Sequence, residues 1–200
     1  MSAGSSPKRT FLCECTNVVF VAGDTVSMDF IWPGPAPRGG QFFLIKPRRT
    51  GVFLGRPISA AGYKPGFQPS ALVSENMAKG AAPDENAGGG DGAAAGTLRF
   101  FVARRGRGSR ELVDLRPGEE AELTGPLGNY WAQMNIPKGS IALVVGGIGI
   151  APLLAFVPEL AGIPRDIIPF DFYAGFRTGS FGLENIKSQA PGLRSLIIAT

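Results

Sequence analysis

The chain has 200 residues, of which 44% are hydrophobic and 18% are charged, with 29 glycines and 17 prolines. This length favours two modest globular lobes, and the composition excludes a disordered chain. The formal net charge is only +4 and the basic residues are dispersed, so we expect no nucleic-acid partner. The absence of histidine from the sequence excludes Ser–His or Cys–His catalysis and imidazole metal ligands.

Cys13 and Cys15 are the only cysteines. Residues two apart in a strand point to the same face, which makes a bridge between them awkward, so we expect reduced thiols. We expect a disordered N-terminus at residues 1–10, which lack the apolar core of a secretory signal, and no apolar run is long enough to span a membrane. These features predict a cytoplasmic protein.

The first part of the chain is rich in short β-type runs separated by glycine and proline turns. Strands are expected at residues 11–31 with a break at 22–24, at 41–47, 53–61 and 98–103, and at 120–124 before the turn Gly125-Pro126. A helical turn is expected at 111–115. This pattern predicts a small antiparallel barrel over residues 11–136. The tract 74–96 has no periodicity and almost no large apolar residue, which predicts a flexible insertion.

The second part alternates strands with helices. Strands are expected at 141–145, 167–174 and 196–200, and helices at 151–161 and 181–188, an order that predicts a parallel sheet. Pro158 is expected to end the first helix early, and Pro169 to interrupt the second strand. Three parallel strands without a closing helix leave one apolar face uncovered, so we expect residues 137–200 to form an incomplete α/β domain.

Two segments have the residue types of a phosphate or cofactor site. Residues 146–152 (GGIGIAP) join a buried strand to a helix, where glycines admit a diphosphate and the helix N-terminus offers free N–H groups. The spacing is not GxGxxG, and a turn kept for close packing is equally consistent. Residues 56–59 (RPIS) offer an arginine fork for a phosphate and a serine hydroxyl for the edge of a flat ring. Taken alone, this segment is also an ordinary strand with a surface arginine.

Two further segments add to the pattern. Residues 104–112 (RRGRGSREL) combine consecutive N–H groups with four arginines, which suits a diphosphate, and a basic loop that touches RNA is the alternative. Residues 124–131 (TGPLGNYW) place a rigid turn beside two aromatic residues. Tyr130 and Trp131 could cover a flat cofactor or simply pack in the core.

These four motifs, in this order, resemble the ferredoxin-NADP reductase superfamily, and within it the electron-transfer subunit of dihydroorotate dehydrogenase. The resemblance covers residues 11–200 and implies an antiparallel Greek-key barrel that binds FAD, followed by a truncated parallel-sheet domain that binds NAD(P)H. It implies that Arg56 pairs with a phosphate and that Ser59 lies near the reactive edge of the flavin. The residues implied on the FAD side are Arg56, Pro57, Ile58, Ser59, Phe101, Val102, Ala103, Gly108 and Ser109.

The nicotinamide-nucleotide side is matched by a second group of residues. They are Gly125, Pro126, Gly146, Gly147, Gly149 and Pro152. Arg177 matches a position near the adenosine end of the dinucleotide, and a plain surface arginine is equally consistent there.

The resemblance implies an FAD-dependent NAD(P)H oxidoreductase. Hydride would pass between NAD(P)H and the flavin, and single electrons would pass through a [2Fe–2S] centre to a catalytic dehydrogenase subunit, in dihydroorotate oxidation within pyrimidine biosynthesis. The cysteine ligands of that cluster, which the family carries after residues 196–200, are absent from this chain. Cys13 and Cys15 cannot replace them because a cluster needs four ligands. The alternatives are a reductase subunit for a hydrogenase or oxygenase, and a non-catalytic, truncated binding module.

Overall fold

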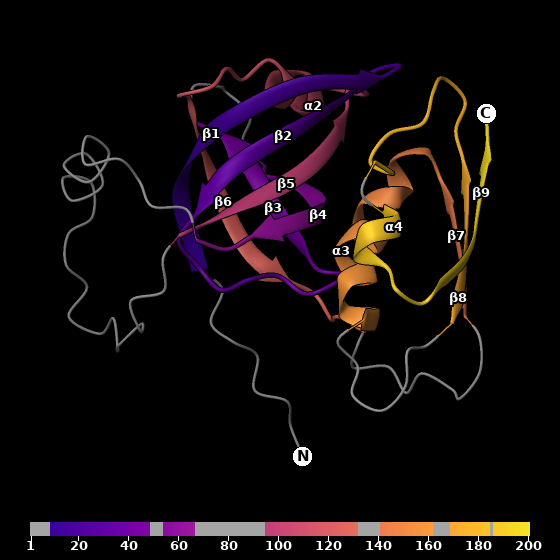
Figure 1. Ribbon diagram of the computed structural model, residues 1–200. Coiled ribbons are helices and arrows are strands. Elements are labelled where there is room, and N and C mark those ends of the chain that lie inside the picture. The colour runs from indigo at the N-terminus through magenta and orange to yellow at the C-terminus, as the bar shows by residue number, and fades with distance from the viewer. Residues whose placement is uncertain (1–8, 49–53, 67–94, 132–140, 162–168, 185) are drawn as a thin grey trace.

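A computed structural model describes residues 9–48, 54–66, 95–131, 141–161, 169–184 and 186–200. A β-barrel stands beside a smaller parallel sheet, and two helices, α3 and α4, lie between them (Figure 1). This arrangement confirms the predicted fold class. The predicted insertion at 74–96 falls almost entirely on residues outside the described ranges.

The barrel contains six strands: β1 (Arg9–Ala22), β2 (Thr25–Trp32), β3 (Phe42–Pro47), β4 (Arg56–Lys64), β5 (Gly96–Ala103) and β6 (Glu120–Leu127). It closes in the order β1-β2-β5-β4-β3-β6, and every neighbouring pair is antiparallel. A short helix, α2 (Arg107–Val113), follows β5. Closure leaves no strand edge unpaired, which holds both ends of each strand in place.

Aromatic rings fill the barrel. Trp32 packs edge-on against Phe43 with ring centroids 5.0 Å apart, and Phe43 packs in the same way against Phe100 at 5.5 Å. All three side chains are fully buried. Alternation places Phe100 in the core while Phe101 points outward, as the period of two along a strand requires.

The two cysteines lie in this core and are free. Burial raises the pKa of Cys13 to about 12 and that of Cys15 to about 11, from an ordinary value of 9.0. The free thiols agree with the prediction of reduced cysteines.

The smaller lobe is built from β7 (Ile141–Gly146), the 3-10 turn η2 (Gly147–Gly149), α3 (Ile150–Ala161), β8 (Phe170–Gly175), α4 (Ile186–Gln189) and β9 (Leu193–Ala199). The strands are parallel in the order β7-β8-β9. Its core joins α3 to the inner face of the sheet, and Phe156, Val157, Phe170 and Phe172 are all buried there.

The prediction for Pro158 is wrong, and for Pro169 the residues before it in the predicted strand, 167–168, lie outside the described ranges. α3 continues through Pro158 to Ala161, because Pro158 is exposed, and water can reach the carbonyl group that the proline leaves without a donor. Pro169 directly precedes β8, and its carbonyl oxygen accepts a hydrogen bond from the N–H of Ile141 at 3.1 Å. Pro169 therefore contributes to the start of the sheet.

Two element boundaries also differ from the predictions. The helix expected at 181–188 is only α4, because Gly182 has a φ of +77° and Phe181 is buried between the rings of Phe101 and Phe176. β6 runs through Gly125-Pro126 to Leu127 instead of turning there, because it pairs with Phe42 of β3.

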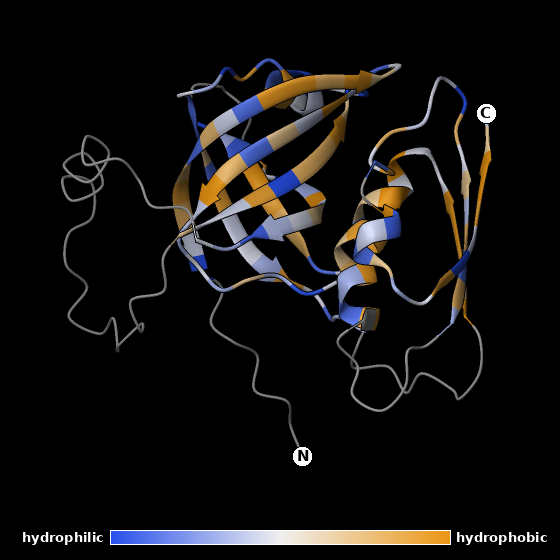
Figure 2. Cartoon of the chain, in the orientation of Figure 1, coloured by the Kyte–Doolittle hydropathy of each residue, from blue (hydrophilic) through white to orange (hydrophobic). Residues whose placement is uncertain are grey.

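The described residues leave one face of the parallel sheet uncovered, as expected. The large exposed apolar side chains that share this face are Val144, Tyr173 and Ile197, with Val144 72% exposed. Figure 2 shows apolar residues along the strands of this sheet. Within the described ranges, none of the helices is long and apolar enough to cross a membrane.

The aromatic core predicts a clear difference between two phenylalanines. Phe43→Ala should lower the free energy of unfolding by about 3–5 kcal/mol, because the ring is fully buried. Phe20→Ala is the matched control, since that ring is 68% exposed, and should change it by less than about 0.5 kcal/mol. Urea unfolding measures both, and equal losses would contradict the barrel core described above.

The buried thiols predict a loss of stability in alkali. Folding raises both pKa values above 9.0, so the unfolded chain loses its thiol protons first, and stability should fall as the pH rises through 9 towards 11 and 12. The double variant Cys13→Ala/Cys15→Ala should show a smaller fall. Urea unfolding at pH 8 and pH 10 measures the difference, and an identical fall in both proteins would refute it.

Candidate functional site

The two FAD-side motifs meet at one end of the barrel. Arg56 begins β4, and Gly108 lies in the first turn of α2, which directly follows β5. The Arg56 guanidinium occupies the space that a side chain at position 108 would need. A Cβ added there would lie 2.0 Å from Nε and 2.5 Å from Cζ of Arg56. The missing side chain of Gly108 therefore makes a notch that holds the arginine.

The Arg56 guanidinium keeps an unused hydrogen-bond donor in this notch. Its Nε is buried and has no hydrogen-bond partner, and Arg56 makes no ion pair with the other described residues. A buried donor without a partner costs free energy unless something binds to it. The guanidinium is thus a fixed positive group with hydrogen-bonding capacity left for an anion.

The loop before α2 is arranged by Ser109. Its Oγ accepts the N–H groups of Arg105 at 2.9 Å and Gly106 at 3.0 Å, and donates to the carbonyl oxygen of Gly106 at 3.1 Å. The predicted phosphate-binding hydroxyl is therefore engaged in capping the helix. The next N–H groups, from Arg107 to Ser109, have no acceptor within the helix because they belong to its first turn.

Three of the four arginines in this loop are paired with carboxylates. Arg104 pairs with Asp114, Arg105 with Asp24 at 3.0 Å, and Arg107 with Glu111 at 3.1 Å. These pairs reduce the positive field that the sequence predicts, and they leave little free charge for the alternative of RNA binding.

The other FAD-side residues lie close by. Ala103 ends β5 directly before this loop, and Val102 is buried in the barrel, so these two residues offer mainly their backbone. Pro57 is exposed and Ser59 is half-buried in β4, whereas Ile58 packs against the barrel core. Phe101 faces the smaller lobe, where its ring meets Phe181 at 5.1 Å.

The glycine-rich turn stands open. A Cβ added at Gly146, Gly147 or Gly149 would find nothing within 4 Å, and Gly147 has a φ of +50°. This open space disfavours the alternative that the glycines serve close packing. The turn opens α3, with Pro152 half-buried in its first turn, and η2 contacts β5 of the barrel. The motif therefore lies on the barrel side of the smaller lobe.

The three remaining predicted positions are Gly125, Pro126 and Arg177. A Cβ at Gly125 would lie 2.4 Å from Cδ1 of Phe43, so Gly125 makes room for the barrel core. Pro126 follows it within β6. Arg177 is exposed after β8, and its neighbour Thr178 packs on Gly23, where a Cβ would lie 2.4 Å from Oγ1 of Thr178.

The aromatic pair at 130–131 belongs to the contact between the lobes. The ring of Trp131 meets that of Phe156 of α3 edge-on at 5.3 Å, and the Arg38 guanidinium lies 4.6 Å from the Tyr130 centroid. These contacts show that Trp131 packs against the smaller lobe.

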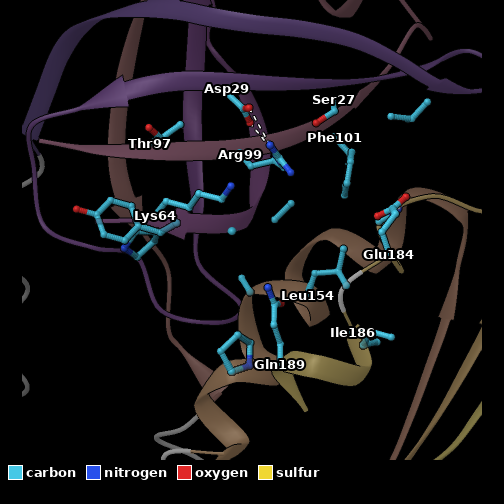
Figure 3. A pocket seen from close by; sticks show the side chains of 18 of the residues that line it. Ser27, Asp29, Lys64, Thr97, Arg99, Phe101, Leu154, Glu184, Ile186 and Gln189 are labelled. Carbon is cyan, nitrogen blue, oxygen red and sulfur yellow. Dashed lines mark hydrogen bonds and ion pairs between the residues drawn. The ribbon is translucent and has the colours of Figure 1, made fainter. Parts of the chain in front are cut away.

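A cleft of about 690 Å³ separates the barrel from α3 and α4, and sequence reasoning missed it (Figure 3). Asp29 and Arg99 face it from paired positions of β2 and β5. Asp29 is 7% exposed and accepts hydrogen bonds from Nε and Nη2 of Arg99 at 2.7 and 2.9 Å, which raises the pKa of Arg99. Lys64 lies on the same wall and Glu184 on the opposite one. The signal in the sequence was a charged residue within each apolar strand.

A metal centre has no support in the described part of the chain. No group of three or more histidine, cysteine, aspartate or glutamate side chains there could hold a metal ion. Cys13 and Cys15 are enclosed in the barrel core.

No family model matches the chain, but named relatives do. The electron transfer subunit of dihydroorotate dehydrogenase B (NAD(+)) from Clostridium perfringens is 35% identical over 147 residues, which are 74% of this chain and 46% of that protein. The subunit of the same name from Caldanaerobacter subterraneus is 28% identical over 181 residues, 90% of this chain and 56% of that protein. The chain spans about half the length of the curated relatives it matches.

Solved structures share the fold over nearly the whole chain. The Amycolatopsis cytochrome P450 reductase GcoB has a TM-score of 0.65 at 23% identity, covering 98% of this chain and 53% of that one. An NADH-dependent reduced ferredoxin-NADP oxidoreductase has a TM-score of 0.63 at 22% identity, covering 98% and 58%. The chain is similar in sequence to dihydroorotate dehydrogenase B electron transfer subunits and shares the fold of ferredoxin reductase-like structures, which confirms the resemblance drawn from its motifs.

The notch at Gly108 predicts a local displacement. Gly108→Ala should push the Arg56 guanidinium aside, so that its Nε–H exchanges faster with water. Gly106→Ala is the matched control, because a Cβ there meets nothing within 4 Å. NMR of the arginine Nε–H groups measures the exchange, and equal rates in the two variants would refute the notch.

Proposed function

We propose that this chain is an FAD-binding, NAD(P)H-dependent electron-transfer component of the type found in dihydroorotate oxidation. The observation that carries the proposal is the Arg56 guanidinium, held in the Gly108 notch with a buried, unpartnered Nε. It lies beside first-turn N–H groups of α2 that have no acceptor within the helix. A diphosphate would satisfy both sets of donors at once.

The chain's residues fit FAD on this side. Arg56 would hold the pyrophosphate together with the backbone N–H groups of Gly108 and Ser109. Ser59, three residues further along β4, would offer its hydroxyl to the edge of the isoalloxazine, and the backbone at the end of β5, at Ala103, would line the ring. Ser109 would act through its capping bonds, which shape the loop.

The glycine-rich turn fits a second dinucleotide. The open space at Gly146, Gly147 and Gly149 would admit the diphosphate of NAD(P)H close to the backbone at the N-terminus of α3. Because η2 contacts β5, a nicotinamide docked there would face a flavin bound at the barrel. Arg177 would lie towards the adenosine end.

The chemistry divides between cofactor and chain. When bound, FAD supplies hydride and single-electron chemistry. Arg56 and the α2 N–H groups neutralise phosphate charge, and the glycine turn and β4 orient the two rings. No side chain is asked to act as an acid or base, which agrees with a sequence that contains no histidine.

The relatives' names support a role for this chain as one subunit of a larger enzyme. They are electron transfer subunits of dihydroorotate dehydrogenase B, so the partner we propose is a catalytic dehydrogenase subunit, in pyrimidine biosynthesis in the cytoplasm. A [2Fe–2S] centre between flavin and partner would need ligands other than Cys13 and Cys15, which are buried in the barrel.

The FAD proposal predicts that the purified protein is yellow and that FAD binding depends on Arg56. The purified chain should show flavin absorbance bands or bind added FAD. Arg56→Ala should weaken FAD binding by about tenfold or more, since a hydrogen bond to a charged group contributes about 1.5–3 kcal/mol. Arg48→Ala is the matched control, because Arg48 is exposed and pairs with Glu120 at 2.6 Å.

Titration calorimetry with FAD measures all three proteins. A colourless chain that takes up no FAD would overturn the proposed function. Equal affinities in the Arg56 and Arg48 variants would overturn the role of Arg56 while leaving the FAD site in place.

A further inference from the structure

A polar contact joins the two lobes. Glu159 of α3 accepts hydrogen bonds from Nε and Nη2 of Arg38, at 3.1 and 3.3 Å, and from the backbone N–H of Gly39 at 2.7 Å. Its side chain is only 16% exposed, and the pair raises the pKa of Arg38. Arg38 and Gly39 lie between β2 and β3, so this carboxylate connects the smaller lobe to the barrel. We call this contact, made by Arg38, Gly39 and Glu159, the interlobe joint.

Close packing surrounds the joint. A Cβ at Gly39 would lie 2.5 Å from the Cα of Phe156, so the barrel loop touches the backbone of α3 directly. The carbonyl oxygen of Gly39 accepts the N–H of Trp131 at 2.9 Å, and the Trp131 ring packs edge-on against Phe156. A Cβ at Gly40, which has a φ of +96°, would lie 3.0 Å from the Trp131 ring nitrogen. The loop is therefore fixed on three sides.

The joint lies near one end of α3 and the glycine-rich turn at the other. Ile150 to Glu159 spans nine helical steps, or about 14 Å at about 1.5 Å per residue. A helix of this length moves as a rigid rod, so its orientation at Glu159 sets the position of the turn at its N-terminus. A small rotation at the joint is enlarged at the turn.

Between the joint and the turn, the lobes are separated by the cleft of about 690 Å³ (Figure 3). Other contacts also hold the lobes together: α3 lies against β4, Thr178 packs on Gly23, and the rings of Phe101 and Phe181 meet. The barrel residues that enter the core of the smaller lobe are Ala22, Ala61 and Phe101. These apolar contacts hold the lobes together, but they are non-directional and do not by themselves set the angle between the lobes. The hydrogen bonds of Glu159 are directional.

We propose that Glu159 is a positioning residue. By accepting hydrogen bonds from Arg38 and Gly39, it fixes the angle of α3 relative to the barrel and thereby holds the glycine-rich turn opposite the Arg56 end of the barrel. The proposal rests on the proposed function for its consequence, which is alignment of the nicotinamide with the flavin. The geometric part, a fixed angle between the lobes, stands without any cofactor.

The geometric part is tested by a distance between spin labels across the cleft. Lys64→Cys on β4 and Lys187→Cys near α4 are exposed label sites, and the buried Cys13 and Cys15 should resist labelling. Double electron–electron resonance on the full chain should give a narrow distribution of the distance between the two labels. Glu159→Gln should at least double its width, and Arg38→Gln should broaden it from the other side of the joint.

Glu120→Gln is the matched control, since it removes the carboxylate partner of Arg48 within the barrel and touches no interlobe contact. Its distribution should match that of the parent chain. Circular dichroism checks that each variant is folded. A distribution that stays narrow in both folded joint variants would overturn the proposal.

The functional consequence has a separate readout. With FAD bound, Glu159→Gln should leave the Kd for FAD unchanged, because the joint is remote from Arg56, but slow the bleaching of the flavin by NADH by about tenfold or more. A chain that binds no FAD would refute the proposed function and leave the label distances to decide the joint. An unchanged bleaching rate together with a broadened distribution would overturn the alignment role of Glu159.

Discussion

Closure of the barrel around an aromatic core is the constraint on which the rest of the molecule depends. Trp32, Phe43 and Phe100 pack edge-on in its interior, and all six strands have two neighbours. Because no strand can slide, the start of β4 and the end of β5 are held at fixed positions. Arg56 and α2 therefore meet in a defined geometry, and a notch as narrow as that at Gly108 can hold a guanidinium.

The smaller lobe is held to this frame mainly through α3. The same helix has the glycine-rich turn at its N-terminus, and near its C-terminus Glu159 hydrogen-bonds to the barrel loop that contains Gly39. One rigid element thus connects the binding turn to the contact that orients it. The cleft beside it contains the ion pair of Asp29 and Arg99, whose bidentate geometry links β2 to β5 in the barrel wall that faces α3.

Motifs proved more informative together than singly. Residues 56–59 would pass for an ordinary strand, and residues 104–112 for a basic loop, yet the structure brings Arg56 and Gly108 into direct contact. Capping by Ser109 and pairing of the neighbouring arginines were invisible in the sequence, because both depend on the precise turn before α2. The predicted glycine at 125 matched a family motif, but its local reason is room for Phe43.

The sequence by itself determined the two-lobe architecture, since alternation of period two followed by strand and helix alternation allows few other folds, and the order of its motifs predicted the resemblance to ferredoxin-NADP reductases. It also predicted the uncovered apolar face of the parallel sheet. Only the tertiary structure decided that α3 continues through Pro158, that Phe181 packs between two aromatic rings instead of starting a helix, and that Glu159 joins the lobes. These outcomes depend on contacts between residues far apart in the chain, such as Glu159 with Gly39 or Phe181 with Phe101, and local patterns contain no information about such partners.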